Sequence, residues 1–125
     1  MKIDELTEQI IGCAYRVHNE LRTGFLEKVY ENALRIEMEL SGLSVKQQVP
    51  IAVYYRDQII GDYAADLLVN ECVIVELKAV RAILPEFEVQ LVNYLTATKI
   101  DDGLLINFGP SVEIRRKYRE YKSKK

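Results

Sequence analysis

The sequence has one histidine and two cysteines, and no run of about 18 apolar residues. His18 and the widely spaced Cys13 and Cys72 cannot supply the ligands of a structural zinc site. The missing apolar run excludes a transmembrane helix, and the acidic residues 1–5 do not resemble a signal peptide. Two free, buried cysteines suit a reducing compartment, so we expect a cytoplasmic protein that does not contact membranes.

The length of 125 residues, nearly half of them apolar, predicts one domain with a real core. The net charge of −2 is unevenly spread, because residues 115–125 carry seven Lys or Arg and one Glu. A basic end can bind the phosphates of a polyanion, or it can simply be solvated, and both interpretations stay open. We expect a domain over residues 1–118 and a basic tail over 119–125.

The periodicity of apolar residues changes along the chain. Steps of three and four residues predict amphipathic helices over 4–21 and from about 26 to 41. Runs of β-branched and aromatic residues predict strands, and Pro85 predicts the start of a third helix. The strands are expected over 45–55, 59–69, 73–80, 104–108 and 112–118, the third helix over 85–99, and a turn over 101–103. The predicted order is ααβββαββ.

The apolar hairpin over residues 66–78 contains three charged residues. The strand period of two places Glu76 and Lys78 on one face. If residues 70–72 form a three-residue loop, Asp66 lies opposite Glu76, whereas a two-residue turn would place it opposite Val75. Two carboxylates can hold a divalent cation while a lysine neutralises charge on a nearby phosphate. The three groups can equally form a structural ion pair at a sheet edge.

Two helices contain further candidates. Glu27 lies in the first turn of the second helix, where it can favour the helix dipole or reach a metal. Gln90 and Tyr94 are four residues apart in the third helix and therefore share a face with Glu86, while Phe87 is expected to point elsewhere.

The combined motifs resemble a known family, the GxxExxY proteins of the PD-(D/E)xK nuclease-like superfamily, from about Ile3 to Ile114. The matching elements are Gly24-x-x-Glu27-x-x-Tyr30, Asp66, Glu76-x-Lys78, Gln90-x-x-x-Tyr94 and residues 103–109. The resemblance implies an α/β (α+β) fold with a restriction-endonuclease-like core, in which helices flank a central mixed β-sheet.

The resemblance also implies roles for individual residues. Asp66 and Glu76 would be metal ligands and catalytic residues, and Lys78 would be the catalytic lysine. Glu27 would reach the Mg²⁺ or Mn²⁺ ion directly or through water. Gln90 and Tyr94 would line the site and contact the substrate. Tyr30 would be structural.

We therefore expect a metal-dependent nuclease-like protein that hydrolyses phosphodiester bonds of DNA or RNA through metal-activated water. One alternative is a non-catalytic nucleic-acid-binding or protein-interaction module that retains the fold. Another is a metal site that acts on a different phosphoester. A homodimer is also expected, because the fold offers little surface to hold a duplex and the first helix has no evident catalytic role.

Overall fold

The computed structural model describes residues 1–120, so residues 121–125 of the expected tail lie outside the described residues. The elements are α1 (Ile3–Leu21), α2 (Glu27–Leu40), β1 (Val45–Tyr55), β2 (Gln58–Val69), β3 (Val73–Lys78), α3 (Pro85–Thr98), β4 (Asp102–Phe108) and β5 (Val112–Tyr118). The predicted order ααβββαββ is confirmed. No helix within residues 1–120 is long and apolar enough to cross a bilayer.

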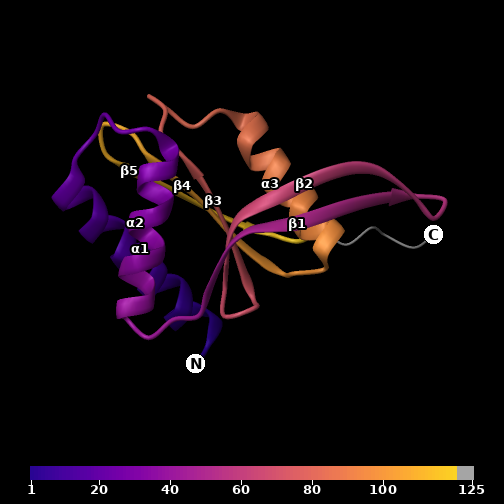
Figure 1. Cartoon of the computed structure of the whole chain (residues 1–125), viewed down its shortest axis with the longest axis horizontal. Helices are drawn as coiled ribbons and strands as arrows, with labels where there is room; N and C mark the ends of the chain where they lie inside the picture. The colour runs from indigo at the N-terminus through magenta and orange to yellow at the C-terminus, as the bar shows by residue number, and fades with distance from the viewer. Residues whose placement is uncertain (121–125) are drawn as a thin grey trace.

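The five strands form one mixed sheet in the order β1-β2-β3-β4-β5. Only β3 and β4 are parallel, and α3 supplies the crossover connection that parallel neighbours require. Helices α1 and α2 cover one face of the sheet and α3 covers the other (Figure 1). The predicted α+β fold, a mixed sheet flanked by helices, is therefore confirmed.

The alternation of side chains along β3 divides its residues between the two cores. Val73, Val75 and Leu77 pack with α1 and α2, whereas Ile74 packs with α3. Glu76 is two residues beyond Ile74, so it belongs to the α3 face of the sheet. This strand is buried on both faces, which explains why its sequence is an almost continuous apolar run.

The core beside α1 and α2 contains Tyr30. Its ring stacks on Phe108 with the centroids 4.7 Å apart, and its hydroxyl donates a hydrogen bond to the Arg22 carbonyl. The His18 imidazole stacks on the same Phe108 and hydrogen bonds to the Gly109 carbonyl through Nε2. These contacts attach the end of α1 and the start of α2 to the end of β4.

Strand β2 is joined to β3 by three residue pairs, Val69 with Val73, Leu68 with Ile74 and Leu67 with Val75. The loop is thus the predicted three-residue loop, and Asn70 and Glu71 in it have the left-handed φ values of 51° and 58°.

Beyond Leu67 the β1–β2 hairpin turns away from β3 (Figure 1) and continues as a two-stranded extension. We call residues 49–65 of this hairpin the arm. Ala65 packs in the core beside α3 while Leu67 packs in the opposite core, so β2 twists sharply between them. We call the point of separation, at Asp66 and Glu76, the fork.

Three sequence predictions are wrong in detail. Asp102 and Gly103 do not form a turn, because they pair with Val73 and Ile74 at the start of the parallel ladder. Strand β3 ends at Lys78 rather than at residue 80. The N–H and C=O groups of Val80 hydrogen bond to the Asn107 side chain instead of to a neighbouring strand. Cys72 is exposed, because it lies in the β2–β3 loop rather than in a core.

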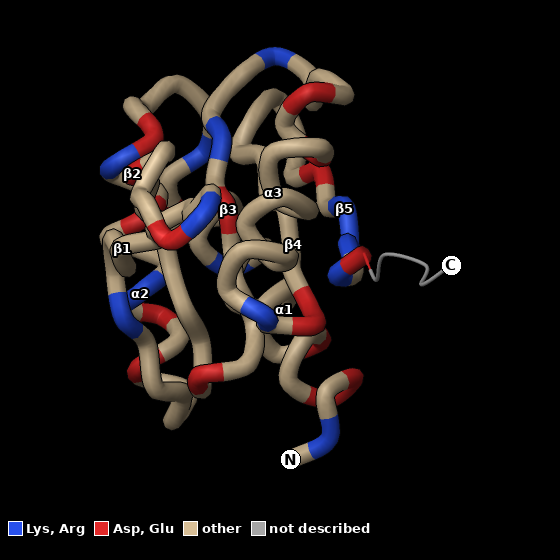
Figure 2. The backbone as a smooth tube through the Cα atoms, turned by 90° about the vertical axis from the view of Figure 1, so that its right-hand side faces the viewer, with Lys and Arg blue, Asp and Glu red and all other residues tan. Residues whose placement is uncertain are grey.

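The basic segment begins on β5. Figure 2 shows its Lys and Arg positions side by side on this strand. Arg116 forms an ion pair with Asp4 at 2.7 Å, and Lys117 forms one with Glu88 at 3.2 Å. These cations already neutralise acids of the domain, so a charge count from the sequence overstates what this segment offers to an external polyanion.

Candidate active site

The fork between β2 and β3 is bridged by two carboxylates. The Asp66 backbone N–H donates to Glu76 Oε1 at 2.9 Å, and the Leu77 backbone N–H donates to Asp66 Oδ2 at 2.8 Å. Where two strands separate, their backbone donors lose the partners of the ladder and need replacements. Asp66 and Glu76 supply those replacements with their side chains, which fixes both carboxylates at the fork.

A buried acid of α2 extends the site on the other side of Asp66. Glu31 is only 2% exposed. Its carboxylate accepts hydrogen bonds from Lys28, Gln47 and Gln48. The Gln48 amide also donates to Asp66 Oδ1 at 3.3 Å, so one side chain connects the helix acid to the strand acid.

The backbone of Gln48 has an unusual conformation. Its φ is 52°, in the left-handed region that costs a non-glycine residue about 1–2 kcal/mol. Successive side chains of a regular strand point to opposite faces, yet the amides of Gln47 and Gln48 both reach Glu31. The left-handed residue breaks the alternation at this point, and backbone strain of this kind is concentrated at functional sites.

Burial and mutual repulsion disfavour charge on the two carboxyl groups. Burial raises the pKa of Glu76 to about 8, with further contributions from the charge of Asp66 and the hydrogen bond between the two groups. Burial also raises the pKa of Asp66, although the Leu77 N–H opposes the change. The two groups therefore titrate as a pair that retains about one proton near neutral pH.

Glu27 lies close enough to interact with this pair. Its pKa is raised first by burial and then by the charge of Asp66, while Lys78 lowers it. The predicted gathering of Glu27, Asp66 and Glu76 around one point is nevertheless absent. Among residues 1–120, no three Asp, Glu, His or Cys side chains are placed to hold a metal ion. The reason is that Asp66 and Glu76 turn toward backbone N–H groups.

The α3 side of the site contains the other predicted residues. Lys78 Nζ lies 4.4 Å from the centre of the Phe87 ring, and the Gln90 amide donates to the Tyr94 hydroxyl at 2.9 Å. The pKa of Tyr94 is raised by burial and then by the charges of Glu76 and Asp66, which places this phenol beside the acids. Phe87 was expected to point elsewhere, but it packs on the lysine.

Glu31, Gln47 and Gln48 are the site residues that sequence reasoning missed. A signal for each was present. Glu31 is four residues from Glu27 and so shares its helix face. The pair Gln47-Gln48 interrupts the alternation of polar and apolar residues in an otherwise regular strand pattern.

The acids at and beside the fork have the chemistry that a divalent cation requires, although the described residues do not gather three of them around one point. Carboxylate oxygens are the hard ligands that Mg²⁺ and Mn²⁺ prefer, and three acids interact electrostatically here. Asp66 and Glu76 share one retained proton, which neutralises one of their two negative charges. A divalent cation that displaced this proton would change the net charge of the pair from −1 to zero.

Comparisons with known proteins identify the family and the fold of the chain. The model of the PD-(D/E)XK nuclease superfamily matches residues 4–119, and the chain belongs to this superfamily. The solved structure described as "Crystal structure of SSO0001" is similar with a TM-score of 0.58 at 17% identity. The match covers 77% of this chain and 52% of the other, so the chain spans about half the length of that protein and shares its fold. No curated protein matches the sequence.

Proposed function

We propose that residues 1–118 form a metal-dependent nuclease domain that hydrolyses phosphodiester bonds of DNA or RNA. Within the superfamily, the GxxExxY proteins are the group we propose for it, on the motif from Gly24 to Tyr30. The observation that carries the proposal is the pair of the half-buried Asp66 and the buried Glu76, with Lys78 two residues further along the same strand face. We also propose a cytoplasmic location, because both cysteines are free thiols.

The residues of the fork would divide the work. Asp66 and Glu76, with Glu27 directly or through water, would hold Mg²⁺ or Mn²⁺. When bound, the ion supplies a Lewis acid for the phosphoryl oxygen and lowers the pKa of bound water. The Lys78 ammonium would neutralise charge on the phosphate, and its contact with Phe87 limits the positions it can take.

The remaining residues would position the substrate and the acids. Gln90 and Tyr94 are hydrogen bonded to each other beside the acids, so either can contact a nucleotide held there. Gln48 and Glu31 hold Asp66 from the opposite side, which keeps its carboxylate at the fork before any ligand arrives.

One observation favours the alternative, a non-catalytic module that retains the fold. Both carboxylates satisfy backbone N–H groups of the sheet, which is a sufficient structural reason for acids at the fork. This alternative predicts that Asp66→Asn changes stability but that the wild-type protein binds no Mn²⁺ and cuts nothing.

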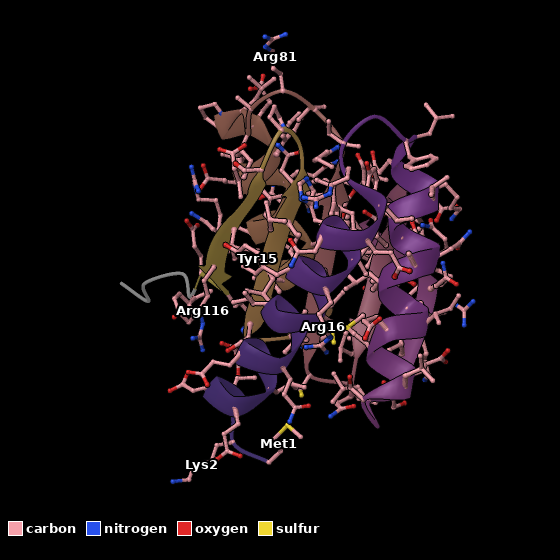
Figure 3. All side chains as sticks on the ribbon, turned by 90° about the vertical axis from the view of Figure 1, so that its left-hand side faces the viewer. Met1, Lys2, Tyr15, Arg16, Arg81 and Arg116 are labelled. Atoms are coloured by element: carbon pink, nitrogen blue, oxygen red, sulfur yellow. The ribbon has the colours of Figure 1, made fainter. Side chains whose placement is uncertain are left out.

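The test combines calorimetry with cleavage. Isothermal titration with Mn²⁺ is run on the wild type, Asp66→Asn and Lys78→Ala, followed by assays on single- and double-stranded DNA and RNA. We expect Asp66→Asn to lose Mn²⁺ binding and cleavage, and Lys78→Ala to lose cleavage alone. The matched control is Lys2→Ala, at the exposed start of α1 (Figure 3). Absence of Mn²⁺ binding at millimolar concentration would establish the non-catalytic module.

A further inference from the structure

An open groove of about 1020 Å³ lies between the arm and α3. It includes Lys78 at the end of β3 and Phe87 at the start of α3, and it extends as far as Ala97, near the end of that helix. Small-molecule sites usually measure about 300–1,000 Å³, so the groove has room for at least one nucleotide. Because Lys78, Gln90 and Tyr94 line it, the groove is continuous with the proposed active site.

Aromatic rings line both sides of the groove. On the arm, Tyr54 and Tyr63 are 62% and 48% exposed, and on α3 the Tyr94 ring lies 5.7 Å from that of Tyr63. The Tyr63 ring lies against Gly61, where an added Cβ would come within 2.7 Å of it. Exposed aromatic faces in a concave surface mark a binding site, and every nucleobase can stack on such a face.

The polar groups of the groove suit bases rather than phosphates. Gln90 and Asn93 both line it, and a carboxamide offers two donors and an acceptor, the combination that pairs with base edges. Among the described residues Lys78 is the only cation of the lining, whereas Glu86 and Glu120 are acidic. A phosphate backbone along this lining would be repelled, except at the Lys78 end.

We propose that the groove binds unpaired nucleobases of the substrate strand, with the adjoining phosphate at Lys78. Paired bases of a duplex hide their faces from aromatic side chains, so the substrate class is single-stranded or locally unpaired nucleic acid. The proposal rests on the proposed nuclease function and adds the substrate class to it.

The experiment measures binding by fluorescence anisotropy of labelled oligonucleotides in Ca²⁺, with a single strand and the matching blunt duplex as probes. We expect the wild type to bind the single strand at least about tenfold more tightly than the duplex. Tyr63→Ala should weaken single-strand binding by about tenfold, and Tyr63→Phe should retain it because the stacking face remains. The matched control is Tyr15→Ala, a half-exposed tyrosine on α1 (Figure 3) on the other face of the sheet.

Equal affinity for the two probes, or equal effects of Tyr63→Ala and Tyr15→Ala, would overturn the proposal. Thermal unfolding of each variant establishes that it is folded. Cleavage in Mn²⁺ separates this inference from the proposed function. Loss of binding in Tyr63→Ala without cleavage by the wild type supports the groove and refutes the nuclease. Cleavage unaffected by Tyr63→Ala refutes the groove and leaves the nuclease.

Discussion

Asp66 and Glu76 each complete the hydrogen bonding of the other's strand. Glu76 Oε1 accepts the Asp66 N–H, and Asp66 Oδ2 accepts the N–H of Leu77, the residue after Glu76. The same two groups retain about one proton, because Glu76 is buried, Asp66 is half-buried and their charges repel. The fork therefore combines a structural role, which fixes the carboxylates, with an unfavourable interaction between their charges that the proposed cation would relieve.

The first prediction concerns stability and pH. The pKa of Glu76 is about 8 in the folded protein, against its ordinary value of 4.5. The folded state therefore holds a proton that the unfolded state releases, and stability falls as pH rises from about 4.5 to 8. Glu76→Gln keeps the acceptor without the charge, so the metal-free variant should gain on the order of a few kcal/mol over the wild type at pH 9 and little at pH 4.

Urea unfolding in EDTA at both pH values measures this difference. The control is Glu5→Gln, an exposed residue of α1, which should follow the wild type at both. If the free energy of unfolding of Glu76→Gln differs from that of the wild type by the same amount at both pH values, Glu76 is ionised in the folded protein without a free-energy cost.

The second prediction concerns the coupling of metal binding to protons. Since Asp66 and Glu76 must lose their retained proton to bind a cation, Mn²⁺ affinity should rise by up to about tenfold per pH unit below pH 8 and level off above it. Calorimetry in two buffers of different ionisation enthalpy counts the protons released. We expect about one proton at pH 7, and an affinity independent of pH would contradict the shared proton.

The third prediction concerns Gln48. Gln48→Ala removes the amide that joins Glu31 to Asp66, so Mn²⁺ affinity should fall while the fold is kept. Gln48→Gly removes the same amide but tolerates the φ of 52°, and it should be about 1 kcal/mol more stable than Gln48→Ala. If either variant binds Mn²⁺ as the wild type does, the amide has no positioning role.

The fourth prediction compares two glycines. A Cβ on Gly109 would lie 2.5 Å from the Val80 carbonyl oxygen and 2.9 Å from Asn107 Nδ2, so Gly109→Ala must displace backbone. We expect a loss of about 2–4 kcal/mol in the free energy of unfolding. Gly12→Ala meets its nearest atom, Arg16 Nη1, at 3.5 Å within α1 and should gain about 0.5–1 kcal/mol. If chemical unfolding gives the same change in stability for Gly109→Ala and Gly12→Ala, the predicted difference between the two glycines is wrong.

The homodimer stays a prediction and has a simple test. Light scattering at micromolar concentration should give about twice the 14.4 kDa of the chain. A mass near that of one chain would mean that the monomer holds its substrate without a second copy.

The hairpin register could be predicted from sequence because two signals agreed. The charges expected to meet on one face and the length of the loop over 70–72 place Asp66 opposite Glu76, and the ladder confirms this register as far as the pair of Leu67 and Val75. The order of elements followed from periodicity for the same reason, since each segment is long enough to show its repeat.

The hydrogen bonds that the Asp66 and Glu76 carboxylates accept from backbone N–H groups could not be predicted in this way. It arises because the long hairpin twists away from β3 beyond Leu67, and this exposes backbone donors that only a three-dimensional arrangement reveals. The role of Gln48 depends on a single left-handed residue, which glutamine has no intrinsic tendency to adopt. Asp102 and Gly103 read locally as a turn, but pairing with β3 overrides that local preference.

The short pairing between β2 and β3 leaves the arm attached to the body by side-chain packing on α3 rather than by the β3 ladder. Three residue pairs join β2 to β3, whereas β1 and β2 pair along nearly their whole length, and Ile51 and Ala65 of the arm pack against α3. Because one wall of the groove lies on the arm, the direction in which the hairpin leaves the sheet at Leu67 sets how far Tyr63 stands from α3. The width available to a ligand is thus set at the same point that fixes the two acids.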